Sequence, residues 1–401
     1  MDSEDAARGR IVLKRGRIKP VAMHHPWVYA DAVGRIEGSP GAGDLVDVHD
    51  PVGRFIGHGY FSPQSKIPVK LFSWREEETI DAGFWRARLN QAVELRTGFL
   101  GMSDPSGAVR LVNAEGDGVP GLIVDRYAGY LLVEFLTHGL ARRADMFVEI
   151  LRELTAPAGI FERPEPEISR LEEISRAEGV LAGAEPPELV EITEGPAKFL
   201  VDLRRGQKTG FYLDQRENRL RTAELVRSRR VLDAFCYTGA FSVHAALAGA
   251  KSVQAIDSSE ASIELARRNA EVNGVTAEFA RGNAFERLRM LQLEGETFDM
   301  VIIDPPKLAR SRPGVSKALA AYKDANLSAL KLLAPGGVLV TCCCSGLVSN
   351  QEFLRAVNDA AVDAGRSITI VEKRGASRDH PFVPACPETD YLKCLIARVG
   401  G

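Results

Sequence analysis

Two short stretches of the sequence combine residue types that could do chemistry together. Asp304-Pro305-Pro306-Lys307 follows the apolar run 298–303, and Cys342-Cys343-Cys344-Ser345-Gly346 follows the apolar run 338–341. Each run is typical of a buried strand, and the prolines and the glycine would end the strands there. Ligands of open parallel sheets bind just beyond the carboxyl ends of the strands. We therefore expect a carboxylate and a thiol to form two walls of one active site.

The segment between these two strands predicts the helix that would connect them. Apolar residues recur in 317–333 at helical spacing, at Leu319, Tyr322, Leu327, Leu330 and Leu333. Ala334-Pro335-Gly336-Gly337 would stop that helix. The strand, the helix and the second strand then form a right-handed β-α-β crossover.

The same alternation of strand and helix extends from Arg230 to the end of the chain. Strands are predicted at 231–235, 253–257, 277–280, 368–372 and 391–399, and helices at 240–248, 261–273 and 351–364. Strands that alternate with helices form a doubly wound sheet, so the fold class expected for this part of the chain is α/β.

Two further acids indicate what the sheet could bind. Asp233-Ala234-Phe235-Cys236-Tyr237-Thr238-Gly239 lies at a strand-to-helix turn, and it lacks the Gly-x-Gly-x-x-Gly pattern that a pyrophosphate favours. Asp257 ends the next strand, where a carboxylate can bind two ribose hydroxyls. Each acid alone would more often be a helix cap, but their joint spacing favours a nucleoside without a diphosphate. S-adenosylmethionine is such a nucleoside.

Cys344 is the candidate nucleophile. Methylation of a pyrimidine at carbon-5 is difficult because that carbon is not nucleophilic, and a thiolate that adds at carbon-6 makes it so. A free thiol titrates near ~8.5, so the site must lower that value or form the thiolate during attack. A lone buried cysteine is usually a small core residue. Here a three-cysteine cluster at a strand end that faces Asp304 favours catalysis.

The other cysteines are expected to have no role in the chemistry of metals or disulfides. Cys342 and Cys344 should point to one face of the sheet and Cys343 to the other, if the strand extends that far. We assign Cys236, Cys386 and Cys394 to the core or to incidental positions. The cysteine spacing includes no Cys-x-x-Cys pair and makes a poor disulfide framework, so we expect reduced thiols and no metal.

Composition and charge narrow the class of protein. The chain has 401 residues, of which 45% are apolar and 26% charged, as in a soluble protein of two or three domains. It has neither an apolar stretch that could span a membrane nor a signal-peptide core, so we expect a cytoplasmic protein without a membrane partner. The net charge of −3 argues against a surface covered with basic residues, although it allows a local basic patch.

The chain before the sheet predicts three smaller modules. Short alternating strands between glycine turns in 1–75 predict a small β-barrel, and 76–163 predict a small α+β domain that begins with a helix over Glu76–Gly101. Residues 164–189 are rich in Glu and Pro and predict a linker or a surface insertion, after which 190–401 form the α/β domain.

Two polar segments are left with two interpretations each. The basic residues within 8–19 could be a solvated strand edge or could contact an RNA backbone. The polar loop at the start of 206–219 could cap the helix that follows it or could hold a ligand.

These motifs resemble those of the bacterial 23S ribosomal RNA large-subunit methyltransferase I family, which are cytosine-5 methyltransferases with an N-terminal PUA domain. The resemblance extends over nearly the whole chain: the barrel with His25-Pro26-Trp27 is similar to PUA, and 76–163 to the family's central domain. The most specific motifs are Gln207-Lys208-Thr209-Gly210-Phe211-Tyr212-Leu213-Asp214-Gln215-Arg216, Asp304-Pro305-Pro306-Lys307, Cys344-Ser345-Gly346, Asp379-His380-Pro381 and Tyr391-Leu392-Lys393.

The resemblance implies a C-terminal class I (Rossmann-like) methyltransferase domain that uses S-adenosylmethionine, with Cys344 as the nucleophile and Asp304 binding the target base. It also implies a set of residues that bind the cofactor: Lys208, Thr209, Phe211, Gln215, Asp233, Phe235, Tyr237, Thr238, Gly239, Asp257, Asn283 and Asp304.

The chain departs from the family pattern at two places. The family usually has Ser-Cys-Ser-Gly where this chain has Cys343-Cys344-Ser345-Gly346, so a supporting or competing thiol at Cys342 or Cys343 enters the site. Asn283 stands where such folds commonly place an aspartate near the adenine. Because Asn can donate as well as accept, we expect an altered adenine contact.

The expected function is formation of 5-methylcytidine in 23S ribosomal RNA, free or in the large-subunit particle, through a cysteine–carbon-6 intermediate. Three alternatives stay open: methylation of uridine at carbon-5, methylation of an exocyclic nitrogen, and a non-catalytic RNA-binding role in ribosome assembly. The base that removes the carbon-5 proton is not assigned, a water near Asp304 being one candidate. The oligomeric state is also open, a homodimer included.

Overall fold

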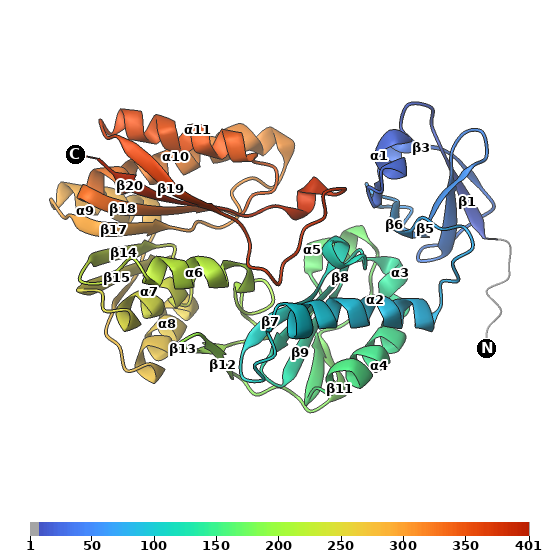
Figure 1. Cartoon of the computed structure of the whole chain (residues 1–401), viewed down its shortest axis with the longest axis horizontal. Coiled ribbons are helices and arrows are strands. Elements are labelled where there is room, and N and C mark those ends of the chain that lie inside the picture. Colours follow the sequence, from blue (N-terminus) through green and yellow to red (C-terminus); the bar gives the residue numbers. More distant parts are fainter. Residues whose placement is uncertain (1–7, 401) are drawn as a thin grey trace. The chain divides into compact units, whose positions relative to one another are not determined.

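The computed structural model describes residues 8–400 and divides the chain into two compact units (Figure 1). The first unit comprises Met1–Val190, Asp202–Phe211 and Arg378–Thr389, and the second comprises Glu191–Val201, Tyr212–Ser377 and Asp390–Gly401. The first seven residues of the predicted barrel lie outside the described part. Among the residues described, no helix has the length and apolar character needed to cross a membrane.

The N-terminal module of the first unit is a mixed six-stranded sheet. Its strands, in the spatial order β2-β6-β5-β4-β1-β3, are β1 (Gly9–Leu13), β2 (Trp27–Val28), β3 (Val33–Glu37), β4 (Leu45–His49), β5 (Phe55–Phe61) and β6 (Val69–Ser73), with the short helices α1 (Lys19–Ala22) and η1 (Ala30–Ala32). Alternate residues such as Ile11, Val46 and Leu71 form its core. The predicted pattern of short strands between glycine turns is confirmed.

The second module of the first unit is a five-stranded sheet covered by helices. Its strands, in the order β11-β10-β9-β8-β7, are β7 (Ala108–Asn113), β8 (Leu122–Tyr127), β9 (Tyr130–Phe135), β10 (Gly159–Glu162) and β11 (Gly179–Gly183). The helical segments are α2 (Ala82–Glu94), η2 (Leu95–Phe99), η3 (Ala114–Asp117), α3 (His138–Ala141), α4 (Ala144–Thr155) and α5 (Pro166–Leu171). The segment expected as a linker or surface insertion therefore holds α5 and an edge strand.

The first helix of this module begins later than predicted. The expected helix covered Glu76–Gly101, whereas α2 begins at Ala82. The Asp81 side chain accepts a hydrogen bond from the Phe84 amide at 2.9 Å and caps the helix there. The acidic stretch before Asp81 consequently lies outside the helix, because Asp81 has an extended backbone and the helical conformation begins only after it.

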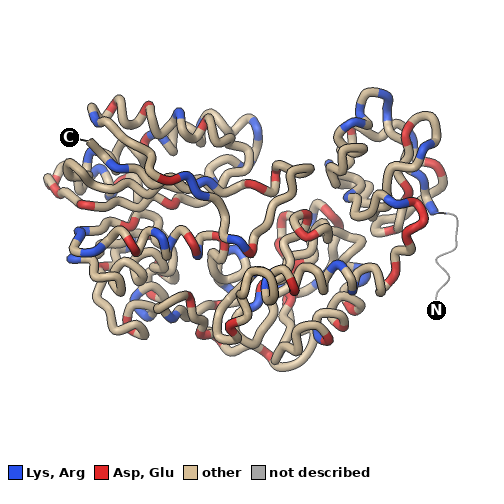
Figure 2. The backbone as a smooth tube through the Cα atoms, viewed as in Figure 1, with Lys and Arg blue, Asp and Glu red and all other residues tan. Residues whose placement is uncertain are grey.

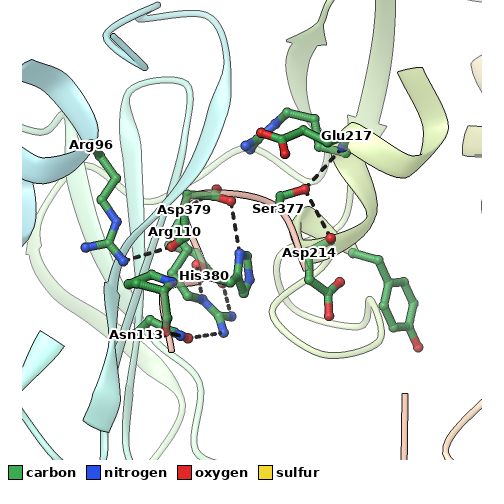
Figure 3. A network of polar contacts seen from close by, with 12 residues as sticks. Arg96, Arg110, Asn113, Asp214, Glu217, Ser377, Asp379 and His380 are labelled. Carbon is green, nitrogen blue, oxygen red and sulfur yellow. Dashed lines mark hydrogen bonds and ion pairs between the residues drawn. The ribbon is translucent and has the colours of Figure 1, made fainter. Parts of the chain in front are cut away.

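Two distant segments of the chain are held in the first unit by buried polar contacts. The Asp379 carboxylate accepts a hydrogen bond from the Arg110 amide at 3.0 Å, and the Asp379 carbonyl accepts one from the buried Arg96 guanidinium at 2.8 Å (Figure 3). Thr209 donates to Asp125 at 2.5 Å and pairs with the Tyr127 hydroxyl at 2.9 Å. These contacts explain why 202–211 and 378–389 belong to this unit.

The second unit is built on a seven-stranded sheet in the order β16-β15-β14-β17-β18-β20-β19. Its strands are β14 (Arg230–Ala234), β15 (Ser252–Asp257), β16 (Glu278–Arg281), β17 (Phe298–Ile303), β18 (Leu333–Cys343), β19 (Ile368–Arg374) and β20 (Lys393–Val399). The first five run parallel, and β20 is antiparallel to both β18 and β19. The predicted doubly wound sheet and the crossover from β17 to β18 are confirmed.

Helices cover both faces of this sheet. On one face α9 (Ala284–Leu293), α10 (Val315–Leu332) and α11 (Asn350–Asp363) pack through residues such as Leu288 and Tyr322, and on the other α7 (Ala240–Leu247) and α8 (Glu260–Val272) pack through Phe241 and Ile263 (Figure 1). The remaining elements are the hairpin β12 (Val190–Glu194) and β13 (Ala197–Val201), η4 (Leu213–Gln215), α6 (Arg216–Ala223), η5 (Arg312–Gly314) and, in the first unit, η6 (Pro387–Thr389).

A buried ion cluster joins β12, α6 and α7. The two Glu194 oxygens accept hydrogen bonds from Arg219 at 2.6 and 2.5 Å, and one of them lies 3.0 Å from His244 Nε2. Burial by itself would raise the pKa of Glu194, but Arg219 and His244 bring it below the usual range. Arg219 also donates to the Tyr212 carbonyl at 2.9 Å. The cluster therefore fixes the chain that leads into α6.

Replacing Arg219 with Met should destabilise the second unit by about 3–5 kcal/mol, because it leaves Glu194 charged, buried and without its main partner. The matched control is Arg287→Met, which removes an exposed pair with Glu294 and should cost less than about 1 kcal/mol. Urea unfolding of the full chain measures both changes, and hydrogen exchange in peptides from α6 and α7 assigns the transition. Equal costs for the two variants would contradict this account.

Candidate active site

The predicted site residues of the second unit gather at one edge of its sheet. Strand order reverses at β14, which has β15 on one side and β17 on the other, and the carboxyl ends of the five parallel strands share one edge. This unit holds nine of the predicted cofactor residues and the predicted nucleophile. All of them except Gln215 lie at the end of a parallel strand or in the segment that follows it: Asp233, Phe235, Tyr237, Thr238, Gly239, Asp257, Asn283, Asp304 and Cys344. Such a reversal point is where open α/β sheets bind ligands.

The turn after β14 has an unusual backbone. Phe235, Tyr237 and Gly239 have φ values of 67°, 51° and 77°, a conformation that costs a non-glycine residue about 1–2 kcal/mol. The Tyr237 amide donates to Asp257 at 2.9 Å, and the Thr238 carbonyl accepts from Asn269 at 3.0 Å. These bonds hold the turn in its strained form, which is common where a backbone surrounds a ligand.

Glycine is required at position 239 for two reasons. Its φ is positive, and a Cβ there would lie 2.9 Å from the Phe279 ring and 3.0 Å from the Ala266 methyl group. The start of α7 can therefore pack closely against α8 and β16.

Asp233 is buried at the end of β14 and only half satisfied. Its Oδ2 accepts a hydrogen bond from Ser242 at 2.6 Å, whereas its Oδ1 has no partner among the described residues. Burial raises the pKa of Asp233 to about 7, against the Ser242 hydrogen bond and with help from the Asp304 and Asp257 carboxylates. Thr238 Oγ1 is a second buried atom without a partner in residues 8–400. Unsatisfied buried atoms in a native structure indicate a ligand or water.

Asp257 and Asn283 lie at the ends of the two strands beyond β14. Asp257 accepts from the Tyr237 and Ser259 amides, both at 2.9 Å, and stays partly exposed, so its remaining lone pairs can accept from hydroxyl groups. Asn283 is exposed and caps α9 by accepting from the Phe285 amide at 3.0 Å and the Glu286 amide at 3.4 Å. An aspartate would cap equally well, so the cap explains why either residue fits at position 283.

Asp304 and Cys344 lie on neighbouring strand ends, as predicted. Ile303 at the end of β17 pairs with Thr341 of β18, and the Cys344 sulfur lies 3.8 Å from the Pro305 carbonyl oxygen. Cys344 is partly exposed, whereas the other cysteines, all within the described residues, are buried. Among these thiols, Cys344 is therefore the one that a ligand can reach.

Ser345 fixes the turn that carries Cys344. Its hydroxyl accepts a hydrogen bond from the Ala309 amide at 3.2 Å and lies 3.1 Å from the Tyr322 hydroxyl, and its carbonyl accepts from Lys393 at 3.1 Å. These partners come from the loop after Asp304, from α10 and from β20. Ser345 is thus a structural residue of this turn.

The two cysteines next to Cys344 are poorly suited to react as nucleophiles. Cys342 and Cys343 belong to the cores on opposite faces of the sheet, as the strand alternation predicts. Cys342 lies opposite Cys394 in the β18–β20 pair. Hydrogen bonding to Cys394 and burial raise the pKa of Cys342, and burial raises that of Cys343. Both therefore stay protonated thiols.

Tyr212 is a residue of the candidate site that was not among the residues predicted from the sequence. Its ring makes an edge-to-face contact with Tyr237, with 5.2 Å between the ring centres. Burial and the nearby Asp304 carboxylate raise the pKa of Tyr212, and Cys344 adds to the effect, so the phenol stays neutral. Tyr212 belongs to one of the motifs that carry the family resemblance, but nothing in the sequence indicated its proximity to both Asp304 and Cys344.

The remaining predicted cofactor residues lie elsewhere. Lys208, Thr209 and Phe211 belong to the first unit, where Thr209 and Phe211 are buried and Lys208 is exposed. Gln215 belongs to the second unit, where it is buried, accepts from Asn218 at 2.6 Å and lies against Cys342.

A cluster of potential metal ligands in the first unit is better explained by hydrogen bonds. His25 Nε2 and Cys386 Sγ lie 3.2 and 3.6 Å from the same Glu388 oxygen. The Trp27 amide donates to His25 Nδ1, so Nε2 carries the proton of the neutral ring and donates to Glu388. Burial raises the pKa of Cys386 to about 12. Hydrogen bonds that centre on Glu388 therefore link the three side chains.

Half of the basic residues of the segment 8–19 in the first module are paired with acids. Arg8, Arg10 and Arg17 lie within 4 Å of Asp47, Glu37 and Asp31 respectively, while Lys14, Arg15 and Lys19 are exposed. Figure 2 shows residues of both signs along this module. The paired arginines support the solvated strand edge, and the exposed cations keep an RNA-backbone contact open.

Known proteins match both parts of the chain. A family model described as a PUA-like domain matches residues 11–74, and a family model described as an S-adenosylmethionine-dependent methyltransferase matches residues 121–398. The ribosomal RNA large subunit methyltransferase I of Aeromonas hydrophila subsp. hydrophila is 41% identical over 392 residues, which cover 97% of this chain and 98% of that protein. The protein of the same name from Erwinia tasmaniensis is 38% identical over 393 residues, 97% and 99% of the two chains.

A solved structure extends the match to the whole fold. The crystal structure of SMU.776, described as a methyltransferase and complexed with SAH, superposes with a TM-score of 0.85 and covers 97% of this chain and 99% of its own at 22% identity. At that identity the likeness shows the fold.

The unsatisfied acceptor of Asp233, the strained turn and the carboxylate of Asp257 fit a nucleoside that also carries a positive charge, in agreement with these matches. The chain therefore belongs to the family of S-adenosylmethionine-dependent ribosomal RNA large-subunit methyltransferases, and S-adenosylmethionine is its methyl donor.

Proposed function

We propose that this enzyme forms 5-methylcytidine in 23S ribosomal RNA, with Cys344 as a covalent nucleophile and Asp304 as the residue that holds the base. The observation that carries the proposal is the 3.8 Å contact between the Cys344 sulfur and the Pro305 carbonyl oxygen, which puts an accessible thiol beside the residue that follows Asp304. A methyltransferase that acts on an exocyclic nitrogen needs no such thiol.

In the proposed reaction, the target cytidine leaves its stack and enters the site, at a cost of a few kcal/mol. The Cys344 thiolate forms a bond to carbon-6, and the electron pair of the carbon-5–carbon-6 double bond moves to carbon-5. S-adenosylmethionine would supply the methyl group to carbon-5 as an electrophile, the bond between its sulfur and the methyl group would break, and S-adenosylhomocysteine would leave. Loss of the carbon-5 proton to a base restores the double bond as the sulfur–carbon bond breaks, so the thiolate is regenerated.

Asp304 and Tyr212 would orient the ring during this sequence. Asp304 is partly exposed at the end of β17 and can accept a hydrogen bond from the exocyclic amine of cytosine, and a protonated N3 would strengthen this contact. Tyr212 stays a neutral phenol, so it can pack or donate but cannot be the base that removes the carbon-5 proton. A water held near Asp304 stays the candidate for that role.

The residues that would hold the cofactor follow from their chemistry. Asp233 offers an acceptor to a positively charged amino group, Thr238 offers a hydroxyl, and Asp257 offers acceptors to the ribose hydroxyls. Phe235, Tyr237, Gly239 and Asn283 border the same turn and strand ends. Contacts from Lys208, Thr209, Phe211 and Gln215 stay predictions that rest on the family resemblance.

The PUA-like module supports an RNA substrate, and the relatives' name supports ribosomal RNA of the large subunit. We infer 23S RNA, free or in a large-subunit particle, as the partner and the cytoplasm as the location. A homodimer stays part of this proposal.

Replacing Cys344 with Ala should lower methyl transfer to ribosomal RNA by about a thousandfold or more, because the substrate loses its route to a nucleophilic carbon-5. The measurement is transfer of a labelled methyl group, followed by digestion of the RNA to nucleosides. Label should appear in 5-methylcytidine with the wild type and with the control Cys394→Ala, and vanish with Cys344→Ala. Label in 5-methyluridine or in an N-methylated nucleoside would assign one of the other activities.

Binding of S-adenosylhomocysteine should weaken as the pH falls from 8 to 6. Burial raises the pKa of Asp233 to about 7, so below that pH the ammonium group of the ligand must displace a proton from Asp233, at up to about tenfold in affinity per pH unit. Calorimetry measures this slope. Asp233→Asn should bind more weakly and lose the slope, whereas Asp257→Asn should bind more weakly and keep it. An unchanged slope in Asp233→Asn would remove Asp233 from the cofactor site.

A further inference from the structure

A lysine is buried next to the turn that carries the nucleophile. Lys393 begins β20 directly opposite Cys343, and only 4% of its surface is exposed. Its Nζ donates to the carbonyl oxygens of Ser345 at 3.1 Å and Tyr391 at 3.0 Å. Lysines are rarely buried to this degree unless they are paired with an acid, and both of these hydrogen-bond partners are neutral. The position therefore needs another explanation than an ion pair.

The groups around Lys393 include both cysteines at the end of β18. Burial lowers the pKa of Lys393, while Cys343, Asp390, Cys344 and Glu352 of α11 act in the opposite direction. Asp390 is exposed, and Glu352 is half-buried and already engaged with Ser349 in the cap of α11. Cys343 and Cys344 are thus among the groups with the strongest charge interaction with Lys393.

The groups around Cys344 would otherwise oppose a thiolate. Asp304 carries a negative charge on the neighbouring strand end, and Tyr212 and Tyr322, which also face Cys344, stay neutral because burial raises their pKa values. A carboxylate beside a thiol favours the protonated form, whereas a cation favours the thiolate. A buried cation is more effective than an exposed one because water screens it less.

We propose that the ammonium group of Lys393 stabilises the thiolate of Cys344 and, through the Ser345 carbonyl, holds the turn that aims it. Lys393 is therefore a positioning residue that acts through Cys344. The inference rests on the proposed role of Cys344 as the nucleophile.

The proton balance of this arrangement is simple. The thiol proton leaves to water when the thiolate forms, and Lys393 keeps its own three protons throughout. Addition to carbon-6 consumes the thiolate charge and elimination restores it, so the ammonium compensates a charge that is present before and after each turnover.

The test measures how fast Cys344 reacts with iodoacetamide as a function of pH, in the full-length protein without RNA. Alkylation is followed by peptide mass spectrometry, with Cys344→Ala as the background and with reaction at the buried Cys342 and Cys343 as a sign of unfolding. Lys393→Met keeps the length of the side chain without its charge, and Lys393→Gln keeps hydrogen-bond donors without the charge. Lys393→Arg keeps a charge.

In Lys393→Met and Lys393→Gln, the pH midpoint of alkylation should rise by about 1–2 units, which lowers the rate at pH 7 by about 10- to 100-fold. Lys393→Arg should restore part of the shift. Binding of S-adenosylhomocysteine should be unchanged in all of them, since a loss of binding would mean a loss of fold. If Lys393→Met fails to fold, Lys393→Gln provides the comparison.

An unchanged midpoint in a folded, uncharged variant would overturn this proposal, even if methyl transfer fell. A midpoint that rises only in Lys393→Met, and not in Lys393→Gln, would also overturn it, because donors alone would then suffice. Failure of the proposed 5-methylcytidine activity would give a different result. In the methyl-transfer experiment, the wild-type enzyme would then place the labelled methyl group elsewhere than on carbon-5, or Cys344→Ala would stay active. Neither outcome depends on the alkylation of Cys344.

Discussion

The hydrogen-bonded register of β17 with its two parallel neighbours is the constraint on which the candidate site depends. Ile303 pairs with Ala234 of β14 on one side and with Thr341 of β18 on the other. Because β14 and β17 end at paired residues and β18 continues from Thr341 only to Cys343, the turn after β14, the carboxylate of Asp304 and the thiol of Cys344 follow at the same edge. A shift of one residue in either pairing would turn the side chains of that strand to the opposite face.

The charges at this edge explain both the cofactor and the inferred role of Lys393. Asp233, Asp257 and Asp304 act on one another, and their proximity contributes to the raised pKa of Asp233. An edge rich in carboxylates suits a methyl donor that carries positive charge, but the same carboxylates disfavour a thiolate nearby. A buried ammonium close to Cys344 reconciles the two requirements, since it offsets the carboxylates at the thiol and leaves them available to the donor.

The sequence predicted the parts of this site that depend on local pattern. The alternation of strand and helix, and the rule that ligands bind at carboxyl ends, were enough to bring Asp233, Asp257, Asp304 and Cys344 together. Tyr212 and Lys393 could not be found in this way, because their positions depend on the hydrogen bond of Arg219 to the Tyr212 carbonyl and on the antiparallel register of β18 with β20. The membership of 202–211 and 378–389 in the first unit likewise depends on contacts such as Asp379 with Arg110, which no local pattern reveals.

The most direct test of the account is covalent trapping with RNA that contains 5-fluorocytidine, in the presence of S-adenosylmethionine. Fluorine at carbon-5 cannot leave as a proton does, so an enzyme that attacks carbon-6 stays bonded to the RNA. The account predicts a complex that survives denaturation, with the nucleotide mapped to Cys344 by peptide mass spectrometry. An active enzyme that forms no such complex, or one that carries the nucleotide on another residue, would contradict it.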